Sequence, residues 1–225
     1  MFYYDPTFLL IIPALLLALF AQYRVNSTYA NYSKVPASIG ITGEALAERI
    51  LANQNLLIKV ESVAGELSDH YDPTAKVLRL SKGVYSGNSV AAMGIVAHEI
   101  GHAMQDAKAY MPLKLRNNFV PAANFGTNFA FPLFFVGIIA GFPFLMDLAI
   151  LLFTFAVVFS VITLPVEFNA SKRAMALLSD GHYLTSQELP MAKSVLSAAA
   201  LTYVAATAMA VLNLIRLLIL RRSRD

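Results

Sequence analysis

The chain has 225 residues, of which 57% are hydrophobic and 14% are charged, whereas soluble domains average roughly 45–50% and about 25%. This composition excludes an ordinary soluble globular protein. The formal net charge of +3 comes from a thinly charged chain without a basic stripe, so nucleic-acid binding is not expected. Because the chain has no cysteine, disulfide scaffolds and cysteine catalysis are excluded, and any metal must be held by histidine and carboxylate side chains.

Long segments without charge predict membrane-spanning helices, since about 20 apolar residues cross the hydrocarbon core. The middle segment, residues 118–165, contains one charged residue, Asp147, and is too long for a single helix. Gly141 and Pro143 are typical of a tight turn, which divides this segment into two helices. We therefore expect four spans, at about residues 6–23, 120–142, 146–164 and 194–215.

The first span is expected to be an uncleaved anchor rather than a signal peptide. Residues 2–5 carry no positive charge, and no small-x-small cleavage site follows the span. The two polar regions, residues 24–116 and 167–193, are separated by two crossings. They must therefore lie on the same side of the membrane, where residues from both can build one site.

We expect the chain to lie in the cell membrane. The positions of the basic residues favour a cytoplasmic location for the two polar regions, although the Arg-rich end of the chain opposes this orientation. The residues that flank the spans on the polar side are Arg24, Lys34, Lys114, Arg116, Lys172, Arg173 and Lys193, and those on the other are Arg216, Arg221, Arg222 and Arg224. The expected organisation is a transmembrane helix (1–23), a polar domain (24–118), a hairpin of two transmembrane helices (119–165), a further polar segment (166–193), a fourth transmembrane helix (194–220) and a basic tail (221–225).

Local patterns predict both helices and strands in the polar domain. Thr42 is expected to cap a helix that ends near Asn53. Residues 56–60 read as a strand, and residues 70–80 read as a hairpin with a type I turn at Asp72-Pro73. A long helix is expected from about Ser89 to Met104, so the fold class is a mainly α polytopic membrane protein with a small α+β domain.

The long helix contains the pattern H-E-x-x-H, with His98, Glu99 and His102. Residues i and i+4 lie one above the other on a helix, so both imidazoles can reach one Zn²⁺. The glutamate between them then points at a metal-bound water. This spacing predicts a zinc site of the zincin type.

A catalytic zinc site needs a third protein ligand. The candidates on the same side of the membrane are Glu167, His70, His182 and several aspartates. Glu167 follows Pro165, which is expected to open a new helical turn at the end of the third span, where a carboxylate is costly unless it is partnered. His182 follows a turn signature, and His70 lies in the expected hairpin, so both are weaker candidates.

Several segments together resemble the YugP-type neutral zinc metallopeptidases of bacterial membranes, over nearly the whole chain. They are residues 69–73 (DHYDP), 78–81 (LRLS), 84–85 (VY), 98–105 (HEIGHAMQ), 165–171 (PVEFNAS) and 198–206 (AAALTYVAA). The order of elements also resembles the HtpX-type and CAAX-type membrane proteases, in which a glutamate after the hairpin of spans is the third zinc ligand. The resemblance implies that role for Glu167. Where those proteases have an acidic residue shortly afterwards, this chain has Asn169 and Ser171, and Asn169 can still accept a hydrogen bond from a ring N–H.

These observations predict a membrane-embedded zinc endopeptidase that holds one Zn²⁺ per chain and acts on a protein or peptide substrate associated with the bilayer. His98, His102 and Glu167 hold the metal, and Glu99 moves the proton from water to the leaving amine. The substrate is expected to add as a strand to a hairpin edge formed by Val77, Leu78, Arg79 and Leu80. Candidates for stabilising the oxyanion are Arg173, His182 and Tyr203, of which Tyr203 also fits an interfacial anchor.

Two other classes of function fit the same residues. In a non-catalytic scaffold or transporter the zinc would be structural, with a fourth ligand supplied by His70 or His182. In a metal-sensing or chaperone-like subunit, the change Glu99→Gln would leave function intact.

Overall fold

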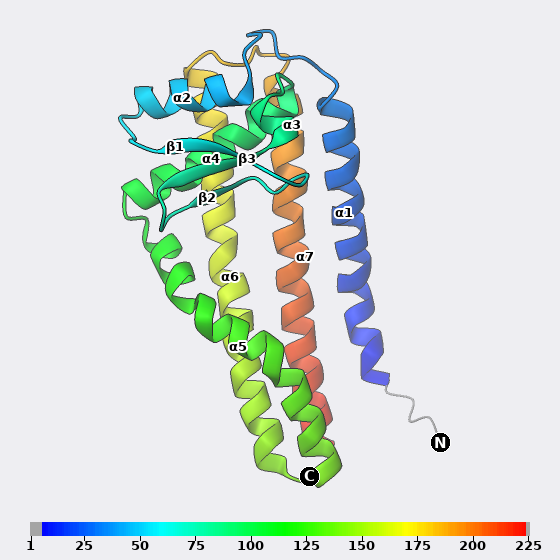
Figure 1. The fold of residues 1–225 in the computed structure, drawn as a ribbon. Coiled ribbons are helices and arrows are strands. Elements are labelled where there is room, and N and C mark those ends of the chain that lie inside the picture. The colour runs from blue at the N-terminus through cyan, green and yellow to red at the C-terminus, as the bar shows by residue number, and fades with distance from the viewer. Residues whose placement is uncertain (1–5, 224–225) are drawn as a thin grey trace. The chain divides into compact units, whose positions relative to one another are not determined.

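The computed structural model describes residues 6–223, so residues 2–5 and Arg224, which the sequence analysis used, lie outside it. Within these residues the chain forms a 3-10 helix (η1, Pro6–Ile11), seven α-helices and three strands, and Figure 1 labels the α-helices and the strands. The helices are α1 (Ile12–Tyr32), α2 (Gly43–Asn53), α3 (Lys82–Tyr85), α4 (Val90–Ala107), α5 (Met111–Ala140), α6 (Pro143–Asp180) and α7 (Leu189–Arg222), and the strands are β1 (Lys59–Val63), β2 (His70–Asp72) and β3 (Val77–Ser81).

The chain forms two compact units. One, the helical unit, comprises Met1–Ala21, Lys114–Pro165 and Thr202–Asp225. The other, the mixed unit, comprises Gln22–Leu113 and Val166–Leu201. Within residues 6–223, four helices are long and apolar enough to cross a membrane, which confirms the predicted polytopic fold: Pro6–Tyr32, Met111–Ala140, Pro143–Asp180 and Leu189–Arg222.

In the helical unit, α5 and α6 form the expected hairpin. Gly141 lies between them with a φ of +65°, a conformation that favours glycine. The two helices approach closely at Gly126, where an added Cβ would lie 2.2 Å from the Leu152 carbonyl oxygen. Arg221 of α7 donates through Nε to Asp147 of α6 at 2.7 Å, so the carboxylate inside the predicted middle segment is paired.

The helices are longer than the predicted spans, and Pro165 lies inside α6. The expectation that Pro165 opens a new helical turn at the end of the third span is therefore wrong, because the helix runs through it. A proline inside a helix removes one N–H donor, and the residues on both sides can still continue the helix. As a result, Glu167 lies on the same helix as the third span.

The mixed unit contains a three-stranded sheet with the order β1-β3-β2. The predicted hairpin of β2 and β3 is confirmed as an antiparallel pair, and β1 pairs with β3 in parallel. The first strand begins at Lys59 rather than at Leu56, because the Leu56 N–H donates to the Leu51 carbonyl and closes the end of α2. Since β3 is the central strand, the expectation that Val77, Leu78, Arg79 and Leu80 form a free edge is wrong.

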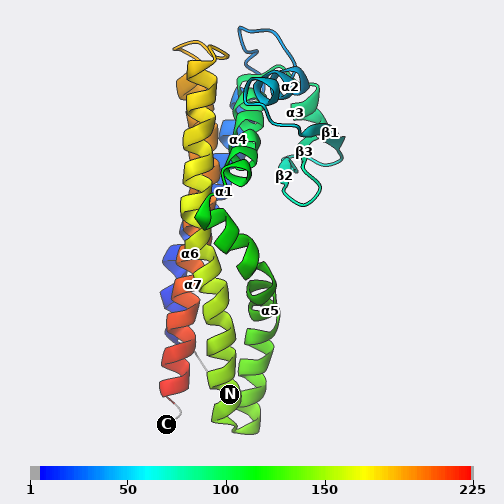
Figure 2. The same cartoon turned by 90° about the vertical axis from the view of Figure 1, so that its left-hand side faces the viewer.

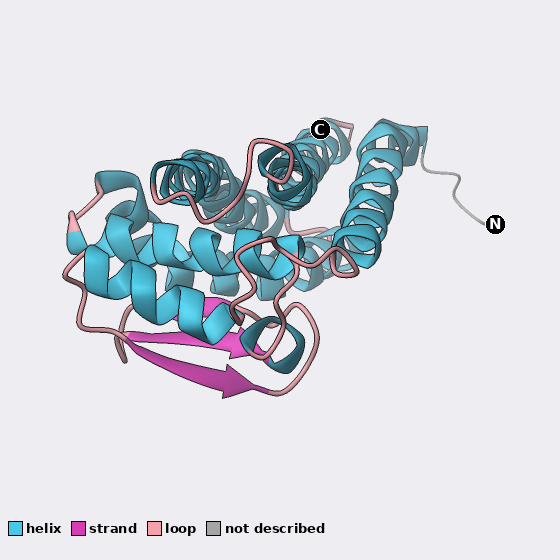
Figure 3. Cartoon of the chain, turned by 90° about the horizontal axis from the view of Figure 1, so that it is seen from above, coloured by secondary structure: helices cyan, strands magenta, loops and turns pink. Residues whose placement is uncertain are grey.

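One face of this sheet is covered by α2 and α4, which lie side by side in Figure 3. Leu78 and Leu80 of β3 are fully buried in the same core cluster as Leu46 and Ile50 of α2 and Val96 of α4. Figure 2 shows α2, α3, α4 and the sheet gathered in one group. The core of the mixed unit therefore fixes α4 against the sheet.

The expected caps position both helices. The Thr42 hydroxyl oxygen accepts from the Ala45 N–H at 3.2 Å, and the Ser89 hydroxyl oxygen accepts from the Ala92 N–H at 3.2 Å. On its other side α4 packs against α6, where an added Cβ at Gly101 would lie 2.6 Å from the Ala170 carbonyl oxygen. Only a glycine allows this approach without displacing a backbone.

We expect Gly101→Ala to separate α4 from α6 and to destabilise the mixed unit by about 1–3 kcal/mol. The matched control is Gly94→Ala on the same helix, where the new Cβ would meet the Ala192 Cβ at 3.5 Å, an ordinary contact. Thermal unfolding of the detergent-solubilised chain measures both variants. Equal melting temperatures for the two variants would contradict the close contact.

Candidate metal centre

Helix α4 places the three residues of the H-E-x-x-H pattern on neighbouring positions of its surface. The rings of His98 and His102 lie with centroids 4.8 Å apart and planes at 87°. Their side chains are 14% and 13% exposed, so both imidazoles are largely shielded from solvent. The two Nε2 atoms face the same partner from α6.

That partner is Glu167, which is buried with 2% of its surface exposed. Its Oε2 atom lies 3.3 Å from His98 Nε2 and 3.5 Å from His102 Nε2. The three ligand atoms all lie within 4.8 Å of one another. The contact between α4 and α6 thus assembles the three predicted ligands from two distant parts of the sequence.

The two nitrogen-to-oxygen separations fit one zinc ion. Ligand atoms at about 2.0–2.2 Å from a tetrahedral zinc ion lie about 3.4 Å from one another. The two measured nitrogen-to-oxygen distances are 3.3 and 3.5 Å. Two imidazoles and one carboxylate also form a donor set that zinc prefers. Within residues 6–223 the group holds three such donors, which is the number of protein ligands that a catalytic zinc ion would need.

A buried amide orients the second histidine. Gln105 has no exposed surface, and its Oε1 lies 3.0 Å from His102 Nδ1. Its Nε2 donates to the Val166 carbonyl at 2.8 Å and to Asn169 Oδ1 at 3.1 Å. When the Gln105 oxygen accepts from Nδ1–H, the His102 tautomer keeps Nε2 available for a metal.

The first histidine has its own partner on α6. The hydroxyl of Ser171 lies 3.2 Å from His98 Nδ1. Among the hydrogen bonds of the described residues, Asn169 makes none to a histidine ring; it accepts from Gln105 and, at 2.7 Å, from Arg173 Nε. The predicted role of Asn169 near the metal is therefore an indirect one, through Gln105.

Glu99 faces the sheet instead of α6. Its Oε2 accepts a hydrogen bond from the Tyr71 backbone N–H at 3.0 Å. Burial raises the pKa of the Glu99 carboxyl, against the opposing effect of the two neighbouring histidines. The contact fixes the carboxylate beside the edge strand β2.

Strand β2 is tied to the end of α4 by a second contact. The Tyr71 hydroxyl donates to Asp106 Oδ2 at 2.7 Å, and Lys76 also pairs with Asp106. Burial and the hydrogen bond to Asp106 raise the pKa of the Tyr71 phenol. Sequence analysis missed Gln105, Tyr71 and Asp106, although the spacing from His102 to Gln105, one helical turn, could have indicated the first.

The other predicted candidates lie outside the three-residue group. His70 is exposed on β2, with Nδ1 2.8 Å from the Ser68 carbonyl oxygen. His182 is exposed in the turn after α6 with a φ of +53°. Tyr203 belongs to the helical unit, and the remaining candidate, Arg173, is in the mixed unit.

Comparison with known proteins adds a family match. The profile of the family described as "Putative neutral zinc metallopeptidase" matches residues 7–222, a range that includes the whole three-residue group. The chain is 45% identical over 218 residues to "Putative membrane protease YugP" of Bacillus subtilis (strain 168), covering 96% of this chain and 97% of that protein. No solved structure matches the chain.

We expect Gln105→Leu to weaken zinc binding by 10-fold to 100-fold, because His102 loses the group that orients it. Competition with a chromogenic chelator measures the affinity. Gln187→Leu, which removes an exposed glutamine, is the matched control and is expected to bind zinc like the wild type. An unchanged affinity in Gln105→Leu would show that the amide does not position the ligand.

Proposed function

Because the chain belongs to the neutral zinc metallopeptidase family, we propose that it is a membrane-embedded zinc endopeptidase. In this proposal His98, His102 and Glu167 hold one zinc ion, and Glu99 is the general base. The observation that carries it is the placement of Glu167 Oε2 at 3.3 and 3.5 Å from the two histidine Nε2 atoms. A buried carboxylate between two imidazoles is the arrangement that a divalent cation stabilises.

Zinc, when bound, supplies Lewis acidity that polarises the scissile carbonyl and acidifies a water molecule. Glu99 receives the proton of the attacking water on its carboxylate and transfers it to the nitrogen of the leaving amine. The Tyr71 N–H holds one of the two Glu99 oxygens, and the other remains for the proton. Burial raises the pKa of this carboxyl, which strengthens it as a base.

The substrate is proposed to bind along the edge strand β2, since both edges of β3 are already paired with other strands. The β2 backbone reaches Glu99 through Tyr71, so a peptide that follows this edge passes the general base. Arg173, His182 and Tyr203 stay predictions for the group that stabilises the oxyanion.

A structural zinc site would require a fourth protein ligand. Neither His70 nor His182 belongs to the group of donors found in the described residues. This favours the catalytic proposal over the scaffold or transporter.

We expect purified wild type and Glu99→Gln to hold about one zinc per chain, and His98→Ala and Glu167→Ala to lose it. Hydrolysis of a fluorogenic casein should fall by several orders of magnitude in Glu99→Gln. Zinc is measured by elemental analysis of the detergent-purified protein. Retention of zinc by Glu167→Ala would refute the ligand set, and normal hydrolysis by Glu99→Gln would refute the general base.

The proposed orientation, with the mixed unit in the cytoplasm of the producing cell, can be tested because the chain has no cysteine. Leu57 is 100% exposed in the mixed unit, and Phe142, between α5 and α6, is 61% exposed. A membrane-impermeant maleimide should label Phe142→Cys in intact spheroplasts and Leu57→Cys only after lysis. The opposite pattern would place the mixed unit outside.

A further inference from the structure

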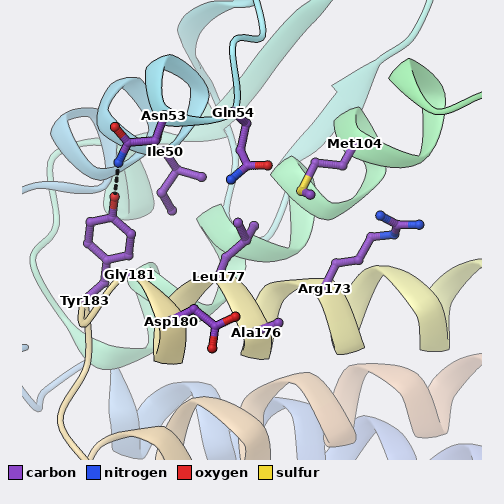
Figure 4. Close-up of a pocket in the computed structure, with 10 residues that line it drawn as sticks. All are labelled: Ile50, Asn53, Gln54, Met104, Arg173, Ala176, Leu177, Asp180, Gly181 and Tyr183. Carbon is purple, nitrogen blue, oxygen red and sulfur yellow. Dashed lines mark hydrogen bonds between the residues drawn. The ribbon is translucent and has the colours of Figure 1, made fainter.

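A cleft separate from the three-residue group lies in the mixed unit between α2, α4 and α6 (Figure 4), with a volume of about 450 Å³. Met104 contributes to its lining from α4. Successive helical residues are rotated by about 100°, so Met104 lies about 200° around α4 from His102. The cleft is therefore on the other side of α4 from the metal centre.

Two opposite charges line this cleft from α6. Arg173 and Asp180 are seven residues apart, which corresponds to about 10 Å along the helix axis. Among the residues that the structure describes, neither makes an ion pair within 4.0 Å. Arg173 uses Nε for Asn169, which leaves its two terminal amino groups for a carboxylate.

The lining between these charges is mostly apolar, with amides on one wall. Ile50 and Leu177 contribute aliphatic surface, and Asn53 and Gln54 come from the end of α2. The Asn53 amide donates to the Tyr183 hydroxyl at 2.9 Å, which fixes one side of the cleft. An apolar lining with a few amides suits a peptide backbone that carries aliphatic side chains.

We propose that this cleft binds a short apolar peptide with free ends, its carboxylate on Arg173 and its amino group on Asp180. Arg173 then serves the cleft, which leaves His182 and Tyr203 as the predictions for the oxyanion. An extended tripeptide spans about 10 Å, which is similar to the separation of the Arg173 and Asp180 backbone positions along α6. The proposal rests on the proposed function, because hydrolysis of peptide bonds in membrane proteins yields apolar peptides of this class. The cleft is then a product site distinct from the metal centre.

A peptide in this cleft is coupled to the metal ligands by hydrogen bonds. Arg173 donates to Asn169, Asn169 accepts from Gln105, and Gln105 contacts His102. A carboxylate that draws the Arg173 guanidinium toward the cleft acts on this chain of contacts. Peptide binding and zinc affinity should therefore change together, as linked equilibria require.

The test is calorimetric titration of trileucine into the detergent-solubilised full chain. It uses wild type and also Glu99→Gln, a variant in which binding is measured without hydrolysis. Asp180→Asn and Arg173→Gln should each weaken binding about tenfold, because each removes one charged contact. Ala176→Phe should abolish binding by filling the cleft, since Ala176 lines it.

The matched control is Glu66→Gln, which removes an exposed carboxylate that does not line the cleft and should bind trileucine like the wild type. N-acetyl-trileucine amide, which lacks both terminal charges, should bind at least tenfold more weakly than trileucine. Saturating trileucine should shift the chelator-measured zinc affinity in wild type and not in Ala176→Phe. Circular dichroism checks that each variant is folded.

Absence of binding to wild type would overturn the proposal, and so would equal binding by wild type, Asp180→Asn and Ala176→Phe. Failure of the proposed function is a separate result, because a chain that binds trileucine but does not hydrolyse casein refutes the peptidase alone. A chain that hydrolyses casein without binding trileucine refutes the product site alone.

Discussion

The contact between α4 and α6 at Gly101 and Ala170 is the constraint on which the site depends. It brings Glu167 within 3.3 and 3.5 Å of two histidine nitrogens that lie far from it in the sequence. A buried carboxylate is costly without a positive partner, and a buried imidazole nitrogen is costly without a hydrogen-bond or metal partner. The three side chains therefore stabilise one another only as a group that shares a cation or protons, and that group forms only if the two backbones approach this closely.

The groups that contact the Nδ1 atoms of the two histidines are neutral. Ser171 and Gln105 contact the two Nδ1 atoms, at the places where an acidic residue would add negative charge. Neutral partners fix the ring orientation and tautomer without adding charge to the ligand set. A zinc ion held by two imidazoles and Glu167 then keeps a net charge near +1. That charge favours polarisation of a carbonyl oxygen.

Sequence signals that act within one turn or one hairpin were sufficient for much of the fold. The caps at Thr42 and Ser89 and the hairpin of β2 and β3 are confirmed because each depends on neighbouring residues. The order β1-β3-β2 was not predictable, since the parallel pairing of β1 with β3 depends on packing against α2 and α4. The contact of Glu99 with the Tyr71 backbone was missed for a different reason, because every residue type except proline carries the same backbone N–H donor.

Helix α6 has to be held in one axial position against α4. One residue of helix rises 1.5 Å, whereas zinc bonds tolerate about 0.2 Å, so even a small slide of α6 would remove Glu167 from bonding range. The Gly101 contact limits the lateral distance between α4 and α6. The hydrogen bond from Gln105 to the Val166 carbonyl, 2.8 Å long, fixes the axial position of α6. Gln105 therefore makes two contacts of consequence, since the amide beside His102 also sets the axial position of the helix that carries Glu167, the third ligand in the proposal. A peptide that acts on Gln105 through Arg173 would reach both α4 and α6 through this one side chain.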